Sequence, residues 1–406
     1  MKVLQINAVY GKKSTGMIVR DIDNMLIEKG HSSYVGFQDG DISDTNKYKI
    51  GNVVDWKIHA LFTRLLGKQG YCSKRATKKF LDQVTKIQPD IIHLHNLHAN
   101  YIHLNVLLNY VVKNNISLVI TLHDCWFFTG KCFHYVESNC EKWKTQCQHC
   151  PRNKMDIKSW FFDESKTVYN DKKSHFAMVK NLTVVACSNW MARQAKQSFL
   201  REREIRTIYN GVDIQLFKPH STTIRETFNL EKKFLIFGAA NKWLDCKNKE
   251  LLDYFVRNLA ENECLILFGC SQEDKERLKS YEKVKALDYI YDRSVIADWF
   301  ATVDVFANVT FADTLPTVNM EATACGTPVV TYDVGGSSEL VEEGVTGYVI
   351  DVNNYVEFFN AIQKIKNKNI QREKCRIFAE QNFDKNKNYL DYLSLYENIL
   401  FGEKNR

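Results

Sequence analysis

Asp313 and Glu321 have a spacing and a setting suited to binding a phosphorylated sugar. They stand eight residues apart in FADTLPTVNMEATACGTPVV, residues 311–330. Pro316 fits the first turn of a short helix and Gly326 fits its end. The start of that helix would offer unpaired N–H groups and partial positive charge to a diphosphate. Glu321 could then accept hydrogen bonds from ribose hydroxyls, and Asp313 from a second sugar. An ordinary helix with a capping acid and a surface acid has the same spacing.

Two lysines follow a strand-like run in GAANKWLDCKNKELL, residues 238–252. Lys242 and Lys247 suit the negative charge that builds up on a leaving nucleoside diphosphate. Without other context they would be two solvated lysines on a loop. No Asp-x-Asp metal motif stands where a diphosphate would need one, and the acidic segment 39–44 is interpreted as a surface loop.

The stretch YGKKSTGM, residues 10–17, follows the first strand-like run and opens a helical pattern. It is not a Walker loop, because Met17 and Ile18 follow its second glycine, and it is not a dinucleotide fingerprint. An ordinary strand-to-helix turn is the plain alternative. His123 ends another strand, LVITLHD, where a structural histidine would also fit. Three polar residues follow a further strand and are assigned loosely to the acceptor side: His95, Asn96 and His98.

Four of the twelve cysteines are clustered in KCFHYVESNCEKWKTQCQHCP, residues 131–151: Cys132, Cys140, Cys147 and Cys150. A Cys-x-x-Cys pair is a common nucleus of tetrahedral zinc sites, so we expect one structural zinc. His134 and His149 could replace one thiol. Disulfides are disfavoured in a reducing cytoplasm, and packed thiols suit so polar a segment poorly. A zinc module that binds nucleic acid is a further alternative, but no clustered arginines follow.

The elements that must position these residues alternate regularly along the chain. Strand-like apolar runs occupy residues 2–9, 90–95, 118–124, 182–188, 233–240, 264–269, 303–310 and 327–334. Helical patterns lie between them, which predicts parallel sheets covered on both faces. A polar stretch near 218–233 separates two such sets. We therefore predict an α/β protein of two doubly wound domains, with ligands at the carboxyl ends of the strands in the cleft between the domains.

Composition sets broad limits on the function. The 406 residues are 45% hydrophobic and carry a formal net charge of +7, which suits phosphorylated substrates or an anionic membrane but does not demand nucleic acid. The amino-terminal apolar run is too short for a signal peptide, so the chain is expected in the cytoplasm. Residues 56–68 place Ile58, Leu61, Phe62, Leu65 and Leu66 on one helical face. This face is expected either in the core or on the inner face of a membrane.

The segment DTLPTVNMEATACGTPVVTYDVGGSSELVEEGVTGYVI, residues 313–350, resembles the donor-site signature of glycosyltransferase family 4, whose members are retaining enzymes of GT-B fold. IYNGVDIQLFKP and CSNWMARQ are similar to further segments of the family. HLHNLH, TLHDCWFFTGKC and the cysteine-rich insert occur together in its branch for colanic acid and other polysaccharides. The chain departs in two places: Asp313 replaces a glutamate and Lys242 replaces an arginine. Thr323 fills the variable position between Ala322 and Ala324.

The resemblance implies transfer of a hexose from a UDP- or GDP-linked sugar to a glycan acceptor, expected to be lipid-linked, in the assembly of a bacterial-type surface polysaccharide. The closest alternative is a nucleotide-sugar epimerase on the same fold. An acceptor-side domain is expected over 1–208, with the cysteine-rich insert at about 130–152. A donor-binding domain is expected over 209–383, and a helical segment over 384–406 should return to the first domain.

The resemblance also assigns site residues. Catalytic roles fall to His123, Lys247, Asp313 and Glu321. Donor binding falls to Ser14, Thr15, Gly16, Lys242, Lys247, Thr314, Leu315, Pro316, Thr317 and Glu321. Ser14, Thr15 and Gly16 are expected to form a loop whose backbone amides approach the diphosphate. The implied mechanism needs no metal: the acceptor attacks from the face that the diphosphate leaves, and positioning and charge stabilisation drive the reaction.

Overall fold

The computed structural model describes residues 1–40, 45–368 and 370–402, and its chain forms two compact units. Unit 1 comprises Met1–Asn210 and the chain from Asn388 onward, and unit 2 comprises Gly211–Lys387. The expected boundaries, 208/209 and 383/384, lie within a few residues of these. Of the acidic segment 39–44, Asp39 and Gly40 end a strand, and the rest lies outside the described residues.

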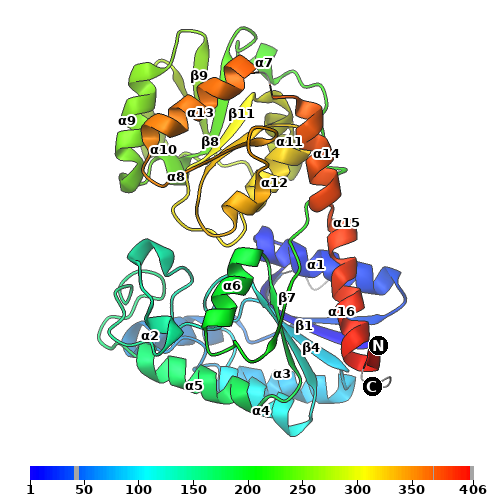
Figure 1. The fold of residues 1–406 in the computed structure, drawn as a ribbon. Helices are drawn as coiled ribbons and strands as arrows, with labels where there is room; N and C mark the ends of the chain where they lie inside the picture. Colours follow the sequence, from blue (N-terminus) through cyan, green and yellow to red (C-terminus); the bar gives the residue numbers. More distant parts are fainter. Residues whose placement is uncertain (41–44, 369, 403–406) are drawn as a thin grey trace. The chain divides into compact units, whose positions relative to one another are not determined.

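Unit 1 is built from a parallel sheet and helices that follow its strands (Figure 1). Its strands are β1 (Lys2–Tyr10), β2 (Ser32–Gly40), β3 (Lys47–Lys49), β4 (Ile91–Leu94), β5 (Ser117–Leu122), β6 (Leu182–Ala186) and β7 (Glu204–Thr207). Its helices are α1 (Lys13–Glu28), α2 (Val53–Leu66), α3 (Lys74–Ile87), α4 (Leu104–Lys113), α5 (Ser165–Met178), α6 (Asn189–Gln197) and α16 (Leu390–Phe401), with 3-10 turns η1 (Val136–Ser138) and η2 (Lys142–Lys144).

The sheet of unit 1 has the order β3-β2-β1-β4-β5-β6-β7 with parallel neighbours. On one face, strand residues such as Val3, Ile91 and Val119 pack with α1 and with tyrosines of the carboxyl-terminal segment. Tyr396 of α16 is fully buried there. This packing explains why the chain returns to unit 1 after residues 211–387 have formed unit 2.

Unit 2 repeats the same architecture. Its strands are β8 (Phe234–Ala239), β9 (Glu263–Phe268), β10 (Val284–Leu287), β11 (Val305–Asn308), β12 (Val329–Tyr332) and β13 (Gly347–Ile350). Its helices are α7 (Ile224–Thr227), α8 (Ala240–Trp243), α9 (Lys249–Asn258), α10 (Gln272–Leu278), α11 (Arg293–Thr302), α12 (Thr317–Ala324), α13 (Tyr355–Lys368) and α14 (Arg372–Asn382), with 3-10 turns η3 (Cys246–Asn248) and η4 (Ser337–Leu340). Helix α15 (Lys385–Asn388) ends at the unit boundary.

The sheet of unit 2 has the order β10-β9-β8-β11-β12-β13, and its neighbouring strands are also parallel. Phe255 of α9 and Phe358 of α13 pack on one face, in a cluster with Ile236 and Val305. Trp299 of α11 stacks on Phe237 from the other face, with ring centroids 5.6 Å apart. The expectation of two doubly wound α/β domains is confirmed.

The polar stretch 218–233 does not separate the two units as expected, because it lies inside unit 2. The guanidinium of Arg225 holds it there, since it donates to the Lys233 and Thr302 carbonyl oxygens and pairs with Asp304 at 2.8 Å. The chain passes from one unit to the other at Asn210–Gly211 instead.

The strand orders fix where a ligand site can lie. In a doubly wound sheet, two neighbouring strands whose connections leave in opposite directions open a crevice at their carboxyl ends. This switch lies between β1 and β4 in unit 1 and between β8 and β11 in unit 2. The candidate residues follow these same strands: Gly16 follows β1, His95 follows β4, Lys242 follows β8 and Asp313 follows β11.

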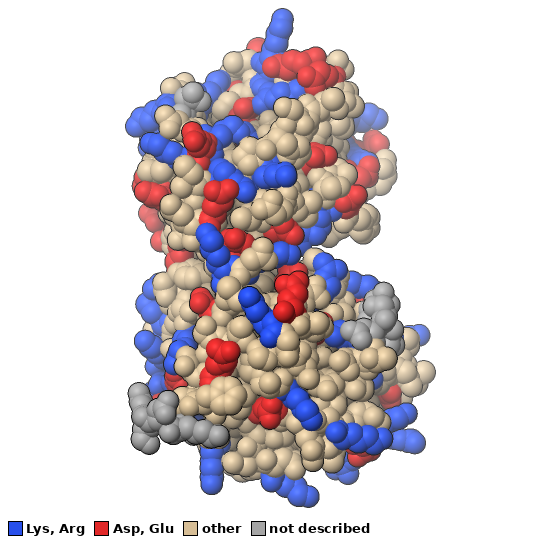
Figure 2. Space-filling model, turned by 90° about the vertical axis from the view of Figure 1, so that its right-hand side faces the viewer, with Lys and Arg blue, Asp and Glu red and all other residues tan. Residues whose placement is uncertain are grey.

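Lysine and arginine side chains are interspersed with acids over the face shown in Figure 2. No single sign of charge dominates this face in either unit. The basic side chains on this side are therefore mixed with acids and do not form one basic patch.

Candidate functional site

The loop that carries Asp313 is held at the carboxyl end of β11. Asp313 Oδ1 accepts a hydrogen bond from the backbone N–H of Leu315 at 3.0 Å. Gly335 lies so close that a Cβ atom there would stand 1.6 Å from the Asp313 carbonyl oxygen. Asp313 thus shapes its own turn at the carboxyl end of β11.

Helix α12 is tied to the same strand by buried amides. Asn308, the last residue of β11, donates from Nδ2 to Asn319 Oδ1 at 2.8 Å. Pro316 precedes the helix with extended backbone and so fixes where it starts. The predicted contacts Thr314, Leu315 and Pro316 have buried side chains, while Thr317 is half-buried at the first helical position. These four residues can therefore offer backbone groups more readily than side chains.

Glu321 is nearly enclosed, with 13% of its side chain exposed, and its Oε1 accepts from Arg293 Nη2 at 2.8 Å. Burial raises the pKa of Glu321 to about 7, although the positive charge of Arg293 lowers it. Burial has the larger effect because Arg293 is 38% exposed, so water screens its charge. Near neutral pH the carboxyl group is poised between its charged and neutral forms, as a ligand-binding acid often is.

The two lysines lie on a loop that the structure anchors to β11. Asn248 Nδ2 donates both to the Lys242 carbonyl at 2.9 Å and to the Val309 carbonyl at 2.8 Å. Lys247 is exposed, and its Nζ stands 5.2 Å from the centre of the Phe311 ring. The ammonium group of Lys247 therefore lies beside the segment that leads into the Asp313 loop.

In unit 1 the residues after β1 differ from the expectation in one detail. Helix α1 already begins at Lys13, so Ser14, Thr15 and Gly16 form its first turn rather than a loop before it. The loop is shorter because Gly11, with φ +68°, turns the chain at once and donates to the Gly16 carbonyl. A Cβ atom on Gly16 would stand 2.9 Å from Val9 Cγ2, so glycine is required for this tight packing of helix on strand.

His123 lies directly after β5 and is buried. Its Nε2 is 2.9 Å from His95 Nδ1, and His95 Nε2 is 3.2 Å from Gln5 Oε1. Burial lowers the pKa of His123 to about 4, with Asp124 opposing and His98 adding to the shift. His123 is therefore neutral at physiological pH and acts as a hydrogen-bonding group rather than as a cation.

The other two residues assigned loosely to the acceptor side, Asn96 and His98, follow β4. His98 Nε2 is 2.7 Å from Asp124 Oδ2. The backbone of Asn96 donates to Asn7 Oδ1 and accepts from the Ala8 N–H, so this residue ties β1 to β4. His98 and Asp124 thus form a hydrogen-bonded pair at the same sheet edge as His123.

Sequence reasoning missed two members of these clusters, Arg293 and Asp124. Arg293 opens α11 just after Asp292, which caps that helix, and this looks like an ordinary helix start in the sequence. Only the fold brings it to Glu321, 28 residues further on. Asp124 follows His123 directly in LHD, and its position at a strand end was a signal that could have been used.

The four clustered cysteines line one small cavity of unit 1, and all twelve cysteines are free thiols. Within the described part of the chain, no three His, Cys, Asp or Glu side chains stand as they would around a bound metal ion. His149 is exposed, and His134 is half-buried. Neither histidine lines the cavity.

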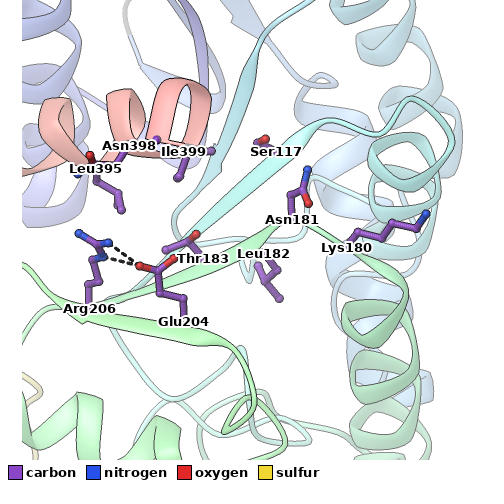
Figure 3. Close-up of a pocket in the computed structure, with 11 residues that line it drawn as sticks. Ser117, Lys180, Asn181, Leu182, Thr183, Glu204, Arg206, Leu395, Asn398 and Ile399 are labelled. Atoms are coloured by element: carbon purple, nitrogen blue, oxygen red, sulfur yellow. Dashed lines mark hydrogen bonds and ion pairs between the residues drawn. The ribbon is translucent and has the colours of Figure 1, made fainter. Parts of the chain in front are cut away.

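A larger cavity, of about 570 Å³, lies at the opposite edge of the unit 1 sheet (Figure 3). Ser117, Leu182 and Glu204 line it where β5, β6 and β7 begin, and Ile399 of α16 faces it. This is the amino-terminal edge of the strands, away from the edge where doubly wound folds bind their ligands. The cavity is separate from the candidate residues.

Helix α2 presents its apolar side chains outward. Its buried residues are polar: His59 contacts Ser73 Oγ at 2.7 Å and Thr63 donates to Asn100 Oδ1 at 3.0 Å. The alternative that the 56–68 stripe is core is therefore wrong for Ile58, Leu61, Phe62 and Leu66, which are exposed, while Leu65 is half-buried.

A second exposed apolar segment adjoins this helix. The N–H of Trp160 donates to the Arg64 carbonyl, and Phe161 is 70% exposed. We define the α2 patch as the exposed residues Val53, Val54, Trp56, Ile58, Leu61, Phe62, Leu66, Trp160, Phe161 and Phe162. In the described ranges, no helix has the length and apolar character to cross a bilayer.

Comparison with known proteins relates this chain to sugar-transferring enzymes. The model of "Glycosyltransferase Family 4" matches residues 16–216 and that of "Glycosyl transferases group 1" matches residues 231–368, which together cover more than half of the chain. N-acetyl-alpha-D-glucosaminyl L-malate synthase of Bacillus anthracis is 23% identical over 57% of this chain and 63% of its own length. The putative colanic acid biosynthesis glycosyl transferase WcaC of Escherichia coli K12 is 24% identical over 63% of this chain and 62% of its own length. The match thus spans less than two thirds of these curated relatives.

Solved structures resemble the whole chain. Sucrose-phosphate synthase from Thermosynechococcus elongatus superposes with a TM-score of 0.70 at 16% identity, covering 98% of this chain and 99% of that chain. Anabaena Alr3699/HepE in complex with UDP-glucose gives 0.65 at 18% identity, covering 97% and 99%. The chain therefore belongs to the family 4, group 1 glycosyltransferases and has their GT-B fold of two Rossmann-like domains.

Proposed function

We propose that the chain transfers a sugar from a nucleotide-diphosphate sugar to a glycan acceptor and that the donor binds at the β8–β11 edge of unit 2. One observation carries this proposal: a nearly enclosed acid, Glu321, and an exposed lysine, Lys247, are held by the elements that follow these two strands. The acid suits ribose hydroxyls and the lysine suits a diphosphate.

Each donor group has a proposed partner. Glu321 accepts hydrogen bonds from the ribose hydroxyls, with Arg293 holding its carboxylate from the other side. Lys242 and Lys247 offset the charge of the diphosphate, and backbone groups of residues 314–317 bind its oxygens at the start of α12. Asp313 accepts from hydroxyls of the transferred sugar.

Unit 1 has two proposed ligand-binding groups of its own. The first turn of α1, with Ser14, Thr15 and Gly16, offers backbone N–H groups to phosphate oxygens. His123, held neutral by burial, hydrogen-bonds a sugar hydroxyl without adding charge. His95 fixes the orientation of the His123 ring, because its Nδ1 is within hydrogen-bonding distance of His123 Nε2, at 2.9 Å.

The proposed reaction retains the configuration of the transferred sugar. The acceptor hydroxyl attacks from the face that the diphosphate leaves, and a leaving phosphate oxygen takes the acceptor proton. The new glycosidic bond forms as the bond to the diphosphate breaks. Lys247 stabilises the charge that develops on that diphosphate, which is where such a group lowers the barrier most.

A UDP-linked hexose is the first donor to test, because the structure of the similar Anabaena protein contains UDP-glucose. The test is a panel of UDP- and GDP-sugars scored for slow release of the nucleoside diphosphate. We expect hydrolysis of one donor, reduced about 100-fold by Glu321→Gln and by Lys247→Ala. The matched control Lys249→Ala changes another exposed lysine at the start of α9 and should retain the activity.

Two results would contradict the proposal. Near-normal turnover in both Glu321→Gln and Lys247→Ala would show that these two residues do not bind the donor. Conversion of the nucleotide sugar into an isomer, without release of the diphosphate and without an acceptor, would assign the chain as an epimerase.

We propose further that the acceptor is a lipid-linked glycan in surface polysaccharide assembly and that the α2 patch rests on an anionic membrane. The similarity to the putative colanic acid biosynthesis glycosyl transferase of Escherichia coli supports the polysaccharide role. The patch supports the membrane contact because its exposed apolar residues are accompanied by exposed cations, among them Lys57, Arg64, Lys154 and Lys158. Apolar insertion combined with basic side chains is how interfacial helices bind anionic lipid.

A further inference from the structure

The cysteine-rich insert brings four thiols to one place. Cys132, Cys140, Cys147 and Cys150 all line a cavity of about 10 Å³. A cavity of that size admits roughly one water-sized sphere, which is also enough space for one small metal ion.

A backbone N–H group points at one of these sulfurs. Gly130 donates to Cys147 Sγ at 3.2 Å. Gly130 is needed for this approach, because a Cβ atom there would stand 2.4 Å from the Ser165 carbonyl oxygen. Donors of this kind stabilise sulfur as a thiolate, the form that binds metal.

The insert has few other means of holding its shape. Between Phe133 and Pro151 its regular structure is limited to the 3-10 turns η1 and η2. Trp143 is its main buried anchor, packed on Phe128 and Tyr135 with ring centroids 5.2 and 4.7 Å apart. A lobe with so little core is the setting in which a structural metal contributes folding energy.

We propose that Cys132, Cys140, Cys147 and Cys150 bind one structural Zn²⁺ as four thiolates. The four thiols lose their protons to solvent, and the metal with its ligands carries two negative charges, which Lys131 and Lys142 at the cavity wall offset. Because no three of the side chains already stand at metal-binding spacing, the sulfurs must turn inward. Rotation about χ1 moves a cysteine sulfur between staggered positions without moving the backbone.

The zinc would fix the segment that follows the β5 strand end. Cys125 donates to the Phe133 carbonyl at 2.8 Å, and Thr129 Oγ1 donates to the Cys132 carbonyl at 2.8 Å. From the other side, the buried Lys172 Nζ donates to the carbonyls of Trp126 and Thr129. The metal thus holds the 125–133 segment, directly after His123 and Asp124, without touching them.

The test is elemental analysis of the full chain purified in reductant without chelator. About one zinc per chain is expected in the wild type and in the control Cys72→Ser, whose thiol lies outside the cavity. Cys140→Ser and Cys147→Ser should lower the zinc content and the thermal midpoint. Since these variants could fail to fold, the wild type is also loaded with Co²⁺, which should give the strong thiolate-to-metal absorption of a four-sulfur site.

Two outcomes would overturn the site. One is wild-type protein that holds no zinc after reconstitution in reductant, with all four thiols accessible to titration. The other is a mass loss of two hydrogens per cysteine pair without bound metal, which would assign the cluster to disulfides.

Discussion

At the scale of single residues, Glu321 shows how burial and pairing compete. Its ion pair with Arg293 favours the charged form of the carboxyl group. Burial disfavours that form more strongly, so the pKa of Glu321 rises from an ordinary value of 4.5 to about 7. A carboxyl group with a raised pKa stabilises the fold fully below about 4.5, and this contribution is lost as the pH rises through about 7. Stability and donor binding should therefore respond to pH in opposite directions.

We predict that UDP or GDP binds more tightly as the pH rises from 6 to 8. The ionised fraction of Glu321 increases about tenfold over this range, and ribose hydroxyls donate more strongly to a carboxylate than to a neutral acid. Calorimetric titration of the nucleotide at several pH values measures this. Glu321→Gln is the control, because it keeps the shape and the titration of the nucleotide but removes the carboxyl group. The same pH profile in both proteins would contradict the assignment.

Sequence patterns could nominate the acids and lysines of the candidate site because helix starts, strand ends and charge are local features. They could not find Arg293, whose partnership with Glu321 depends on how α11 packs beside α12. They also placed Ser14, Thr15 and Gly16 in a loop rather than a helical turn, because the effect of Gly11 at positive φ on the helix start was not recognised.

At the scale of elements, the interior apolar strands other than β2 were predictable and the edge strands were not. The eight expected runs correspond to β1, β4, β5, β6, β8, β9, β11 and β12. The missed strands include β3, β7 and β10, which lie at sheet edges and whose residues are largely half-buried or exposed. A strand covered on fewer sides needs fewer apolar residues, so its sequence resembles a loop.

The donor loop depends on the close approach of Gly335 to Asp313. We predict that Gly335→Ala weakens nucleotide binding at least about tenfold, because a Cβ atom 1.6 Å from a carbonyl oxygen must displace the loop. Gly344→Ala is the matched control: Gly344 also has positive φ, but nothing lies within 4 Å of its added Cβ. It should cost about 1–2 kcal/mol of stability and leave nucleotide affinity unchanged. Equal loss of affinity in the two variants would exclude a steric role for Gly335.

Helix α2 has its polar residues inside and its apolar residues outside, the reverse of an ordinary surface helix. We predict that the protein floats with anionic vesicles at low salt and that Leu61→Asp with Phe62→Asp lowers the bound fraction at least about tenfold. Val356→Asp with Ile377→Asp changes two exposed apolar residues of unit 2 and should float like the wild type. Absence of flotation for the wild type would contradict the proposed membrane contact of the α2 patch.

At the scale of the whole molecule, the repeated strand–helix pattern and the family signature predicted two Rossmann-like domains. The domain limits were less predictable, because the polar stretch 218–233 looks like a linker but is anchored by Arg225 within unit 2. The return of the chain end to unit 1 rests on buried aromatic residues of the last helix, among them Tyr392 and Tyr396.

The central claim is that a nucleotide binds at the β8–β11 edge of unit 2. Amide hydrogen exchange with and without saturating UDP or GDP tests it most directly, because it locates binding without requiring the donor sugar or the acceptor. We predict slower exchange in residues 242–248 and in residues 309–321, which include the Asp313 loop. The side chain of Asn248 joins these two segments by its hydrogen bonds to the Lys242 and Val309 carbonyls. Glu321→Gln should reduce this protection at the same nucleotide concentration. Saturating nucleotide that protects other segments, while these two exchange as in the free protein, would contradict the account.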